Sequence, residues 1–261
     1  MIQALVNGVW KSFSENELQP GTGSFKLNTG LYETFRTRDF KPILLKPHLD
    51  RLFQSAKKIN LEIIYSRLEI EKMIKMVIHN FHDENQRTRV IVSKGTVVIY
   101  TTSLNLDKKI YKGVNTLTIA YTRESPQIKT TEYKGCLDAY NVANKKNCFE
   151  AILLDKDGFV LEGSRSNIFW VISNTLFTRK DKVLPGVTRK TVIRNSPFPV
   201  KYDKLNILDI KGVDELFLTN SGSGIIPVTK IDSIILSKGL PGPITLKLLR
   251  LLKSWSKKTP K

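Results

Sequence analysis

One acidic residue stands where the sequence otherwise predicts buried strands. Glu162 ends the apolar run Phe159-Val160-Leu161, and a second apolar run, Ile168-Phe169-Trp170, follows after a short polar turn. A strand end holds a side chain more rigidly than a loop does. Partial burial also strengthens the attraction between a carboxylate and a cation, because the local dielectric falls. The position therefore predicts a carboxylate that pairs with a cation.

Two further segments have the composition of anion-binding turns. In LPGVTRK (184–190) a glycine precedes a predicted helix, and the N–H groups of a helix N-terminus bind phosphate. In LTNSGSG (218–224) small hydroxyl and glycine residues follow a predicted strand, which suits a backbone anion site. Neither segment matches the phosphate-loop consensus, and each alone is typical of an ordinary turn. Two of them in one half of the chain favour an anion site.

Other chemistries are poorly supported. The chain has three histidines, His48, His79 and His82. They show no ligand spacing with a third partner, and neither cysteine belongs to a C-x-x-C pair, so no metal site is predicted. No G-x-S-x-G elbow supports a serine nucleophile. Cys136 and Cys148 lie in a segment predicted as one helix, so we expect reduced thiols rather than a disulfide.

The elements that must position these residues divide the chain into two parts. In the first part, the sequence predicts a hairpin over 2–12 around Asn7-Gly8 and a strand pair over 30–45. It then predicts a helix opening at Pro47, a helix over 67–80 and a hairpin over 89–102. The polar stretch that follows is irregular. We therefore expect a smaller N-terminal α+β domain over 1–103 and a linker over 104–113.

The second part is rich in predicted strands, over 114–122, 149–154, 159–162, 167–172 and 175–178. Helices are predicted over 136–147, after the glycine turn in 184–193, and over 241–255; residues 214–228 read as a strand, a small-residue loop and an apolar segment. Because strands and helices do not alternate regularly, a doubly wound sheet is not expected. The fold class is α+β, with a larger, strand-rich C-terminal domain over 114–261.

Composition excludes several classes of protein. The 261 residues are 41% hydrophobic and 25% charged, as in an ordinary globular protein. The net charge of +18 invites a nucleic-acid partner, but the lysines are spread over the whole chain and no nucleic-acid-binding motif is present. We expect a basic surface that attracts an anionic substrate or cofactor. No secretory signal and no apolar run of the ~20 residues of a membrane span is found, so a cytoplasmic, membrane-free protein is expected.

The ordered set of motifs resembles one family. From Asn7 to Val228 the chain presents GLYETFRTRDFKPILLKPHLDRLFQSAKKI, RVIVSKG, IKTTEY, FEAILLDKDGFVLEGSRSNIFW, LPGVTR and FLTNSGSGIIPV in this order. This resembles the class IV (fold type IV) pyridoxal-phosphate enzymes, which include branched-chain and D-amino-acid aminotransferases and aminodeoxychorismate lyase. The resemblance implies the two-domain fold of the D-amino-acid aminotransferases, the cofactor pyridoxal 5'-phosphate and a homodimer.

The resemblance also implies roles for single residues. Lys129 in IKTTEY resembles the catalytic lysine that forms the Schiff base with the cofactor; by itself it would be taken for a surface lysine. Glu162 resembles the carboxylate that pairs with the pyridine nitrogen. Arg51 in HLDRL resembles a phosphate-binding arginine; the purely structural alternative for this residue is a salt bridge on the helix surface. The implied phosphate cup comprises Val187, Thr188, Ser221 and Gly222.

Three further residues complete the implied site. Tyr133 resembles the tyrosine near the phenolic oxygen of the cofactor. Tyr32 in GLYETF resembles the aromatic wall of the substrate pocket, with core packing as its alternative, and Ser223 is expected to face the substrate. In the implied mechanism a substrate amine displaces Lys129, the freed amine moves the Cα proton, and the cofactor ring takes up the negative charge.

Departures from the family leave the substrate open. Glu132 stands where many relatives carry asparagine. In RVIVSKGTVVIYTTS, the arginine and histidine that hold the substrate carboxylate in D-amino-acid aminotransferases are replaced by apolar residues or threonine, and the branched-chain pattern is also missing. We expect transfer of an amino group between a small, branched-chain-like amino acid and a 2-keto acid. The alternatives are 4-amino-4-deoxychorismate lyase, giving p-aminobenzoate and pyruvate, and a basic binding module without catalysis.

Overall fold

The Asn7-Gly8 turn begins the first sheet. In the computed structural model, which describes residues 1–22 and 30–255, this turn joins β1 (Ile2–Val6) to β2 (Val9–Phe13). The side chain of Asn7 accepts a hydrogen bond from the Val97 amide at 2.8 Å and donates to the Gly95 carbonyl at 3.0 Å. The first hairpin is thereby fixed to the hairpin around residue 95, and both hairpins predicted from the sequence are confirmed.

Six strands form the sheet of the N-terminal part. Its order is β2-β1-β6-β5-β3-β4, and every pairing is antiparallel. The remaining strands are β3 (Leu31–Arg38), β4 (Lys41–Pro42), β5 (Gln86–Ser93) and β6 (Thr96–Ser103). Successive side chains of a strand point to opposite faces. In β3, Phe35 therefore faces one core, whereas Tyr32 faces another.

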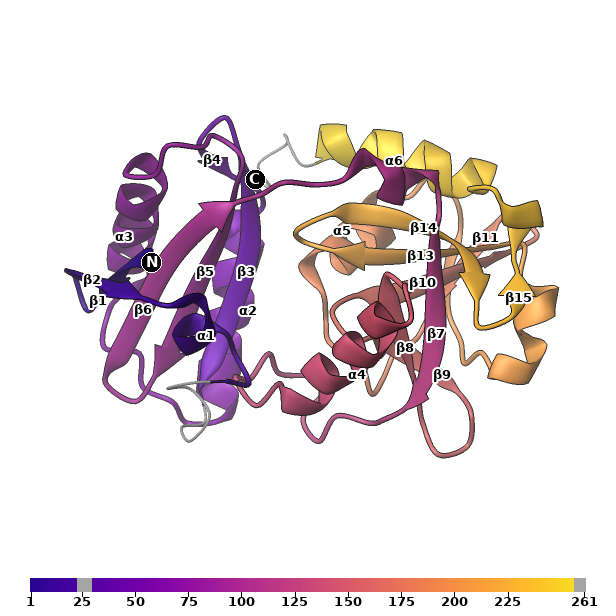
Figure 1. Ribbon diagram of the computed structural model, residues 1–261, viewed down its shortest axis with the longest axis horizontal. Helices are drawn as coiled ribbons and strands as arrows, with labels where there is room; N and C mark the ends of the chain where they lie inside the picture. Colours follow the sequence, from indigo (N-terminus) through magenta and orange to yellow (C-terminus); the bar gives the residue numbers. More distant parts are fainter. Residues whose placement is uncertain (23–29, 256–261) are drawn as a thin grey trace. The chain divides into compact units, whose positions relative to one another are not determined.

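Two helices cover one face of this sheet (Figure 1). They are α2 (Leu45–Lys58) and α3 (Arg67–His79); a single turn, α1 (Glu15–Leu18), lies by the other face, where Leu18 packs with Tyr32. α3 begins with a capping box in which Ser66 and Glu69 bond reciprocally to backbone N–H groups. Apolar residues at helical spacing place the buried side of each helix on the sheet.

The chain folds as two compact units. Unit 1 comprises Met1–Asn105 and Ile128–Lys134, and unit 2 comprises Leu106–Gln127 and Gly135–Lys261. The segment 128–134 thus belongs to unit 1, although its sequence position suggested the C-terminal domain. Within the expected linker, Lys108–Lys112 form a 3-10 helix that belongs to unit 2. Lys129 and Glu162 therefore belong to different units.

Unit 2 contains a mixed nine-stranded sheet. Its order is β12-β11-β10-β13-β14-β7-β8-β9, with β15 paired to β14. The strands are β7 (Val114–Ala120), β8 (Glu150–Leu154), β9 (Val160–Gly163), β10 (Asn167–Ile172), β11 (Thr175–Thr178), β12 (Val200–Tyr202), β13 (Glu215–Asn220), β14 (Gly224–Ile231) and β15 (Ile234–Ile235). The sequence predicted most of these strands; it missed the short β12 and β15, and it indicated only an apolar segment where β14 lies.

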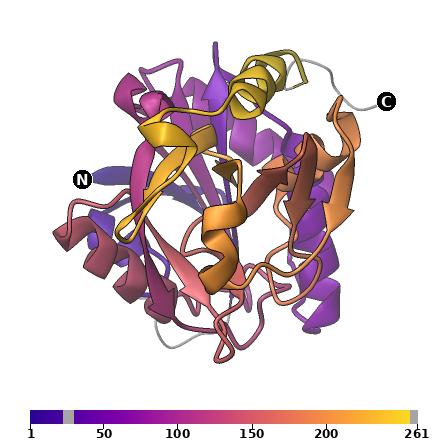
Figure 2. The same cartoon turned by 90° about the vertical axis from the view of Figure 1, so that its right-hand side faces the viewer.

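Alternation along the strands of unit 2 creates two cores. Trp170 and Leu218 belong to the core that the curled sheet encloses, while Phe169 and Phe217 stack at 5.0 Å on the opposite face. That second face is covered by α5 (Val187–Asn195) and α6 (Pro243–Trp255), and α6 is the yellow helix of Figure 2. The expected α+β class is confirmed.

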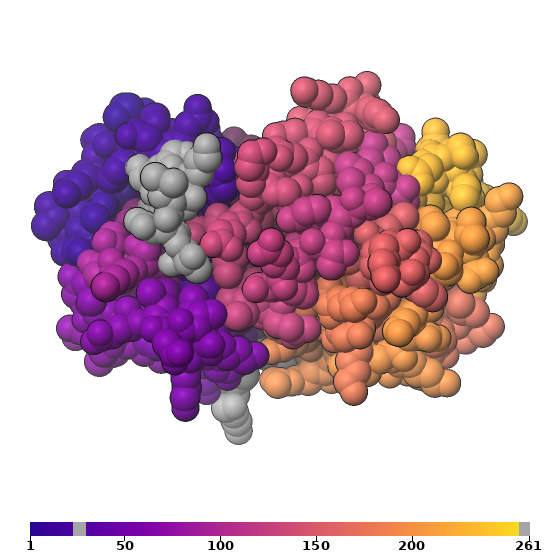
Figure 3. All heavy atoms as spheres, turned by 90° about the horizontal axis from the view of Figure 1, so that it is seen from below, coloured from indigo at the N-terminus to yellow at the C-terminus, as the bar shows by residue number. Residues whose placement is uncertain are grey.

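α4 (Lys134–Lys145) carries exposed residues along one side and lies at the surface of unit 2 in the space-filling view (Figure 3). It starts two residues before the predicted helix and ends two residues before its predicted end. Cys136 is buried in this helix and Cys148 lies beyond it, and both are thiols. Within residues 1–22 and 30–255 no helix combines the length and apolar character needed to cross a membrane.

Candidate active site

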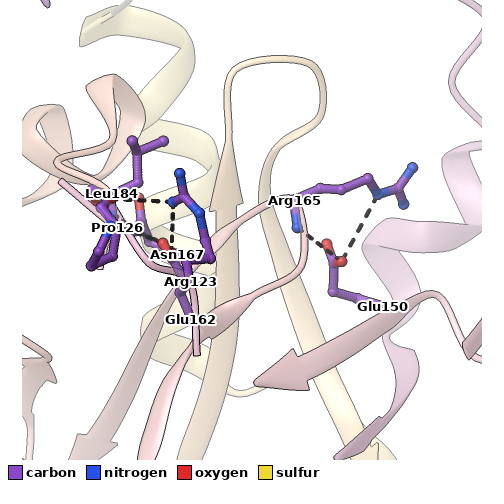
Figure 4. Close-up of polar contacts among 7 residues, drawn as sticks. All are labelled: Arg123, Pro126, Glu150, Glu162, Arg165, Asn167 and Leu184. Atoms are coloured by element: carbon purple, nitrogen blue, oxygen red, sulfur yellow. Dashed lines mark hydrogen bonds and ion pairs between the residues drawn. The ribbon is translucent and has the colours of Figure 1, made fainter. Parts of the chain in front are cut away.

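Glu162 lies at the end of β9 with both carboxylate oxygens bonded (Figure 4). Oε1 accepts from Arg123 Nη1 at 3.0 Å. Oε2 accepts from Asn167 Nδ2 at 3.1 Å and from the Leu184 amide at 2.8 Å. Only 5% of the side chain is exposed, and a buried charge is tolerated when it is paired and hydrogen-bonded. Within the chain itself, the cation that contacts Glu162 is Arg123.

The turn that leaves Glu162 is organised around a second carboxylate. Glu150, fully buried at the start of β8, accepts hydrogen bonds from the hydroxyls of Ser164 and Ser166 and from the Arg165 amide. A side chain at Gly163 would overlap the Ser166 hydroxyl, so glycine is required there. Burial raises the pKa of Glu150, and the more distant Arg165 guanidinium, at 3.8 Å, offsets this only in part.

Asn167 connects Glu162 to the start of α5. Its amide donates to the Leu184 carbonyl at 2.8 Å as well as to Glu162. A Cβ at Gly186 would overlap the Asn167 side chain, so the glycine before α5 allows this close approach. Leu184 lies three positions before Val187, the first residue of α5, and this stretch of chain spans at most about 10 Å. The carboxylate and the helix N-terminus therefore lie near one another.

The start of α5 has the features of an anion site. No side chain caps the helix at Gly186, and the first N–H groups of a helix have no partner inside it. The predicted residues Val187 and Thr188 are both buried in this first turn. Burial lowers the pKa of the neighbouring Arg189. The charges of Tyr202 and Glu162 act in the opposite direction and raise this pKa. The field of Glu162 therefore reaches the first turn of α5.

The second small-residue loop lies at the same end of the sheet. Asn167, the first residue of β10, pairs with Thr219 near the end of β13, and the loop 221–223 follows directly. Asn220 Oδ1 accepts from the Ser223 amide at 2.7 Å, and the Ser223 carbonyl accepts from Tyr111 at 2.9 Å. Ser221, Gly222 and Ser223 are half-buried. The sheet thus gathers Glu162, the α5 N-terminus and this loop at one end.

One buried hydroxyl at this end lacks a partner. Among the residues that the structure describes, Thr219 Oγ1 is buried and makes no hydrogen bond. Thr219 shares a face of the sheet with Asn167, its direct cross-strand neighbour. Buried polar groups are nearly always bonded, so an orphaned hydroxyl beside two anion-binding turns fits a bound phosphate. The sequence did not single out Thr219.

Lys129 lies in unit 1 beside the start of β3. Its carbonyl accepts from the Tyr32 amide at 3.0 Å, and Thr130 forms a bridge with Leu31. The Lys129 ammonium lies 4.2 Å from the centre of the Tyr32 ring, and Tyr133 meets the same ring edge-on with the ring centres 6.0 Å apart. Unit 1 therefore brings together three residues predicted for the site: Lys129, Tyr32 and Tyr133.

Arg51 is buried on α2 and engaged with Glu33. Nε and Nη2 contact the two carboxylate oxygens at 2.7 Å each, and His48 Nδ1 lies 2.7 Å from Oε2. Burial alone would raise the pKa of Glu33, but Arg51 and His48 outweigh it and lower the pKa to about 2. Burial lowers the pKa of His48. Arg51 and Glu33 thus form an ion pair that is buried within unit 1.

Arg89 of β5 is a cation that the sequence did not single out. Its Nη1 donates to the Tyr100 hydroxyl at 3.0 Å, while Nε is buried without a hydrogen-bond partner among the described residues. Alternation places Arg89 on the same sheet face as Ile91, which packs with Tyr32 and Tyr100. An arginine with donor capacity left, set among tyrosines, can bind a carboxylate. The sequence signal that could have identified Arg89 is a charged residue at a position where the alternation of the strand predicts a side chain facing the core.

Comparisons with known proteins identify the family of the chain. The profile of the family "Amino-transferase class IV" matches residues 30–231. Aminodeoxychorismate lyase of Bacillus subtilis is 28% identical and covers 88% of this chain and 86% of its own. D-alanine aminotransferase of Listeria monocytogenes is 29% identical, with 86% of each chain covered.

The fold has a close counterpart among solved structures. A branched-chain amino acid aminotransferase of T.th., solved with pyridoxamine 5'-phosphate, superimposes with a TM-score of 0.85 at 23% identity, covering 99% of this chain and 95% of the other. The fold is thus that of the fold type IV enzymes. The chain belongs to the class IV aminotransferase family, and it is an enzyme of that family.

Proposed function

We propose that the protein is a pyridoxal-phosphate-dependent aminotransferase that exchanges the amino group of a small, branched-chain-like amino acid with a 2-keto acid. The observation that carries the proposal is the arrangement of side chains at one end of the unit 2 sheet. There a buried, fully bonded carboxylate stands within a short reach of an uncapped helix N-terminus. A protonated pyridine ring that carries a phosphate needs an anion for the ring nitrogen and an anion-binding turn for the phosphate.

The residues present fit this cofactor. The α5 N-terminus with Val187 and Thr188 would hold the phosphate, together with the Ser221–Gly222 loop and the unpartnered hydroxyl of Thr219. Glu162 would pair with the ring nitrogen. When bound, pyridoxal 5'-phosphate supplies the electron sink for the substrate carbanion. Arg51 as a phosphate ligand stays a prediction, because the contacts described for it are those to Glu33.

Lys129 is the catalytic residue of the proposal. Its Nζ would carry the cofactor and, once released by the substrate amine, accept the Cα proton as a general base. The Tyr32 ring under the ammonium orients it, since a cation over an aromatic face is attracted by the ring electrons. Tyr133, packed against the same ring, would face the phenolic oxygen of the cofactor.

Arg89 is the best-supported group for holding the substrate carboxylate. Its buried Nε has donor capacity left, and no arginine–histidine pair follows Gly95 in the sequence. Arg89→Gln should raise KM for the amino donor about tenfold while the cofactor stays bound, since a charge-assisted hydrogen bond contributes about 1.5–3 kcal/mol. Arg87→Gln, on the same strand but exposed, is the matched control. Tyr32 and Ser223 are the remaining predicted substrate contacts.

Aminodeoxychorismate lyase is the second candidate function, favoured by the similarity to the Bacillus subtilis lyase over most of both chains. One experiment separates the two reactions. The purified protein loaded with pyridoxal phosphate is incubated with a panel of amino donors, with and without a 2-keto acid, and with aminodeoxychorismate. Strict dependence on the keto acid supports the aminotransferase. Pyruvate formed from aminodeoxychorismate without any keto acid supports the lyase.

A binding module without catalysis is the outcome if the protein takes up no pyridoxal phosphate and converts none of these compounds. A homodimer and a cytoplasmic location stay predictions. Sedimentation of the purified protein, with and without the cofactor, tests the homodimer directly. A monomer that turns over substrate would overturn it.

A further inference from the structure

Arg123 bonds to two groups of the candidate site. It lies in the loop after β7, and its Nη1 donates to Glu162 Oε1 at 3.0 Å and to the Pro126 carbonyl at 3.2 Å (Figure 4). The Arg123 side chain is 14% exposed and that of Glu162 5%, so the pair is largely shielded from solvent screening. Pro126 is the third residue before Lys129 in the chain.

The position of Glu162 has a second, independent support. The donors to Oε2, Asn167 Nδ2 and the Leu184 amide, are both neutral groups. They belong to β10 and to the segment before α5, which lie apart in the chain from the loop that carries Arg123. Replacing Arg123 should therefore leave the carboxylate in place while removing a positive charge from its other oxygen.

Charge is the property that Arg123 adds. Burial favours the neutral form of a carboxylic acid, and an adjacent cation favours the ionised form. We propose that Arg123 is a positioning residue that keeps Glu162 ionised, and so keeps the proton that Glu162 shares with the cofactor on the ring nitrogen. The inference rests on the proposed function, in which Glu162 faces that nitrogen.

The direction of the effect follows from distance. A proton on Glu162 would lie close to the guanidinium, whereas in the proposed arrangement a proton on the ring nitrogen would lie farther from it. Repulsion falls with distance, so Arg123 disfavours the first location more than the second. Without the guanidinium, the shared proton moves toward the carboxylate and the ring nitrogen becomes neutral.

The test observes the ring nitrogen itself. Wild type and variants are loaded with pyridoxal phosphate labelled with ¹⁵N in the ring, and the ¹⁵N chemical shift is measured with the cofactor bound. Glu162→Gln gives the reference value for a ring nitrogen without its carboxylate. Arg123→Gln should move the shift from the wild-type, protonated value toward this reference. Arg123→Lys, which keeps the charge, should stay near wild type.

Arg165→Gln is the matched control. Arg165 lies in the turn after Glu162, but its guanidinium lies near Glu150 (Figure 4). It also lies over the Tyr140 ring. This variant should leave the ring nitrogen shift unchanged. A wild-type shift in Arg123→Gln, or the same displacement in Arg165→Gln, would overturn the proposal. A merely structural Arg123 would lower Tm without moving the nitrogen signal.

The outcome also separates this inference from the function on which it rests. If the wild-type ring nitrogen is neutral and Glu162→Gln leaves it unchanged, the role given to Glu162 fails and the inference fails with it. If Glu162→Gln moves the signal and Arg123→Gln does not, only the inference fails. Should Arg123→Gln take up no cofactor, Arg123→Lys decides: a protonated nitrogen supports the proposal, and a neutral one overturns it.

Discussion

Glu33 in unit 1 and Glu150 in unit 2 are almost completely buried, yet their acidities move in opposite directions. The pKa of Glu33 is lowered to about 2, whereas that of Glu150 is raised. Burial raises the pKa in both cases. The difference lies in the arginine: Arg51 contacts both oxygens of Glu33 at 2.7 Å, while Arg165 stays 3.8 Å from Glu150 and is partly exposed.

The comparison shows how Glu162 should be understood. Serine hydroxyls and one amide bond to Glu150, yet burial still raises its pKa, so these neutral donors do not offset the burial. A guanidinium in direct contact is what distinguishes Glu33. Glu162 has such a contact, with Arg123 at 3.0 Å, beside two neutral donors. Glu162 therefore shares with Glu33 the direct guanidinium contact that Glu150 lacks, and it lies at the end of a strand.

The largest effect is expected at Glu33. Glu33→Gln removes the carboxylate that the buried Arg51 contacts with two nitrogens, and breaking a buried pair costs about 3–5 kcal/mol. We expect the free energy of unfolding, measured with urea, to fall by that amount. Glu62→Gln, at an exposed position of the same unit, is the control and should change it little. A loss below about 1 kcal/mol at Glu33 would contradict the closed ion pair.

Acid should act on the same carboxylate. The folded pKa of Glu33, about 2, lies below its ordinary value of 4.5, so its contribution is fully present above pH 4.5 and is lost as the pH falls toward 2. The difference amounts to about 3 kcal/mol. Urea unfolding at a series of pH values should show this loss in the wild type and a shallower one in Glu33→Gln. Parallel curves would rule the linkage out.

Glu162 should affect chemistry rather than folding. Glu162→Gln keeps hydrogen bonding but loses the charge opposite the ring nitrogen, so turnover should fall about 10- to 100-fold with the cofactor retained. Glu150→Gln, an identical change in the neighbouring carboxylate, should leave turnover nearly unchanged. Both variants are assayed for kcat and for bound cofactor. Equal losses in the two would remove the distinction between them.

The smallest effect is the pH dependence of Glu150. Its folded pKa is raised, so its contribution to stability is present below its ordinary value of 4.5 and is lost as the pH rises through the folded value. This sign is opposite to that of Glu33. Subtracting the unfolding curve of Glu150→Gln from that of the wild type should reveal a contribution that declines with pH. A contribution that grows with pH would mean that Glu150 is held ionised.

Much of this architecture could be predicted from the sequence. Asn7-Gly8 specifies its hairpin locally, and apolar spacing located both helices of unit 1 because these signals need no tertiary partner. β12 and β15 were missed, since a strand of two or three residues carries too little pattern. The assignment of 128–134 to unit 1 depends on pairing between Lys129 and Tyr32, which no local signal announces.

The residues of the candidate site also differ in whether a local sequence signal or only a tertiary contact identifies them. Glu162 and the two small-residue loops could be proposed from the sequence because carboxylates at strand ends and glycine turns are locally conspicuous. Lys129 could be proposed only through the order of family motifs, since one lysine among 42 basic residues has no distinguishing local feature. Arg123 and Thr219 were missed because their importance lies in what they touch, or fail to touch, across distant segments.

The most direct test of the proposed function is the site of cofactor attachment. The purified protein is incubated with pyridoxal phosphate, reduced with borohydride, digested, and its peptides are analysed by mass spectrometry. The account predicts one modified lysine, Lys129, and no modification of that peptide in Lys129→Ala. A protein that takes up no cofactor, or attachment at a different lysine, would contradict it.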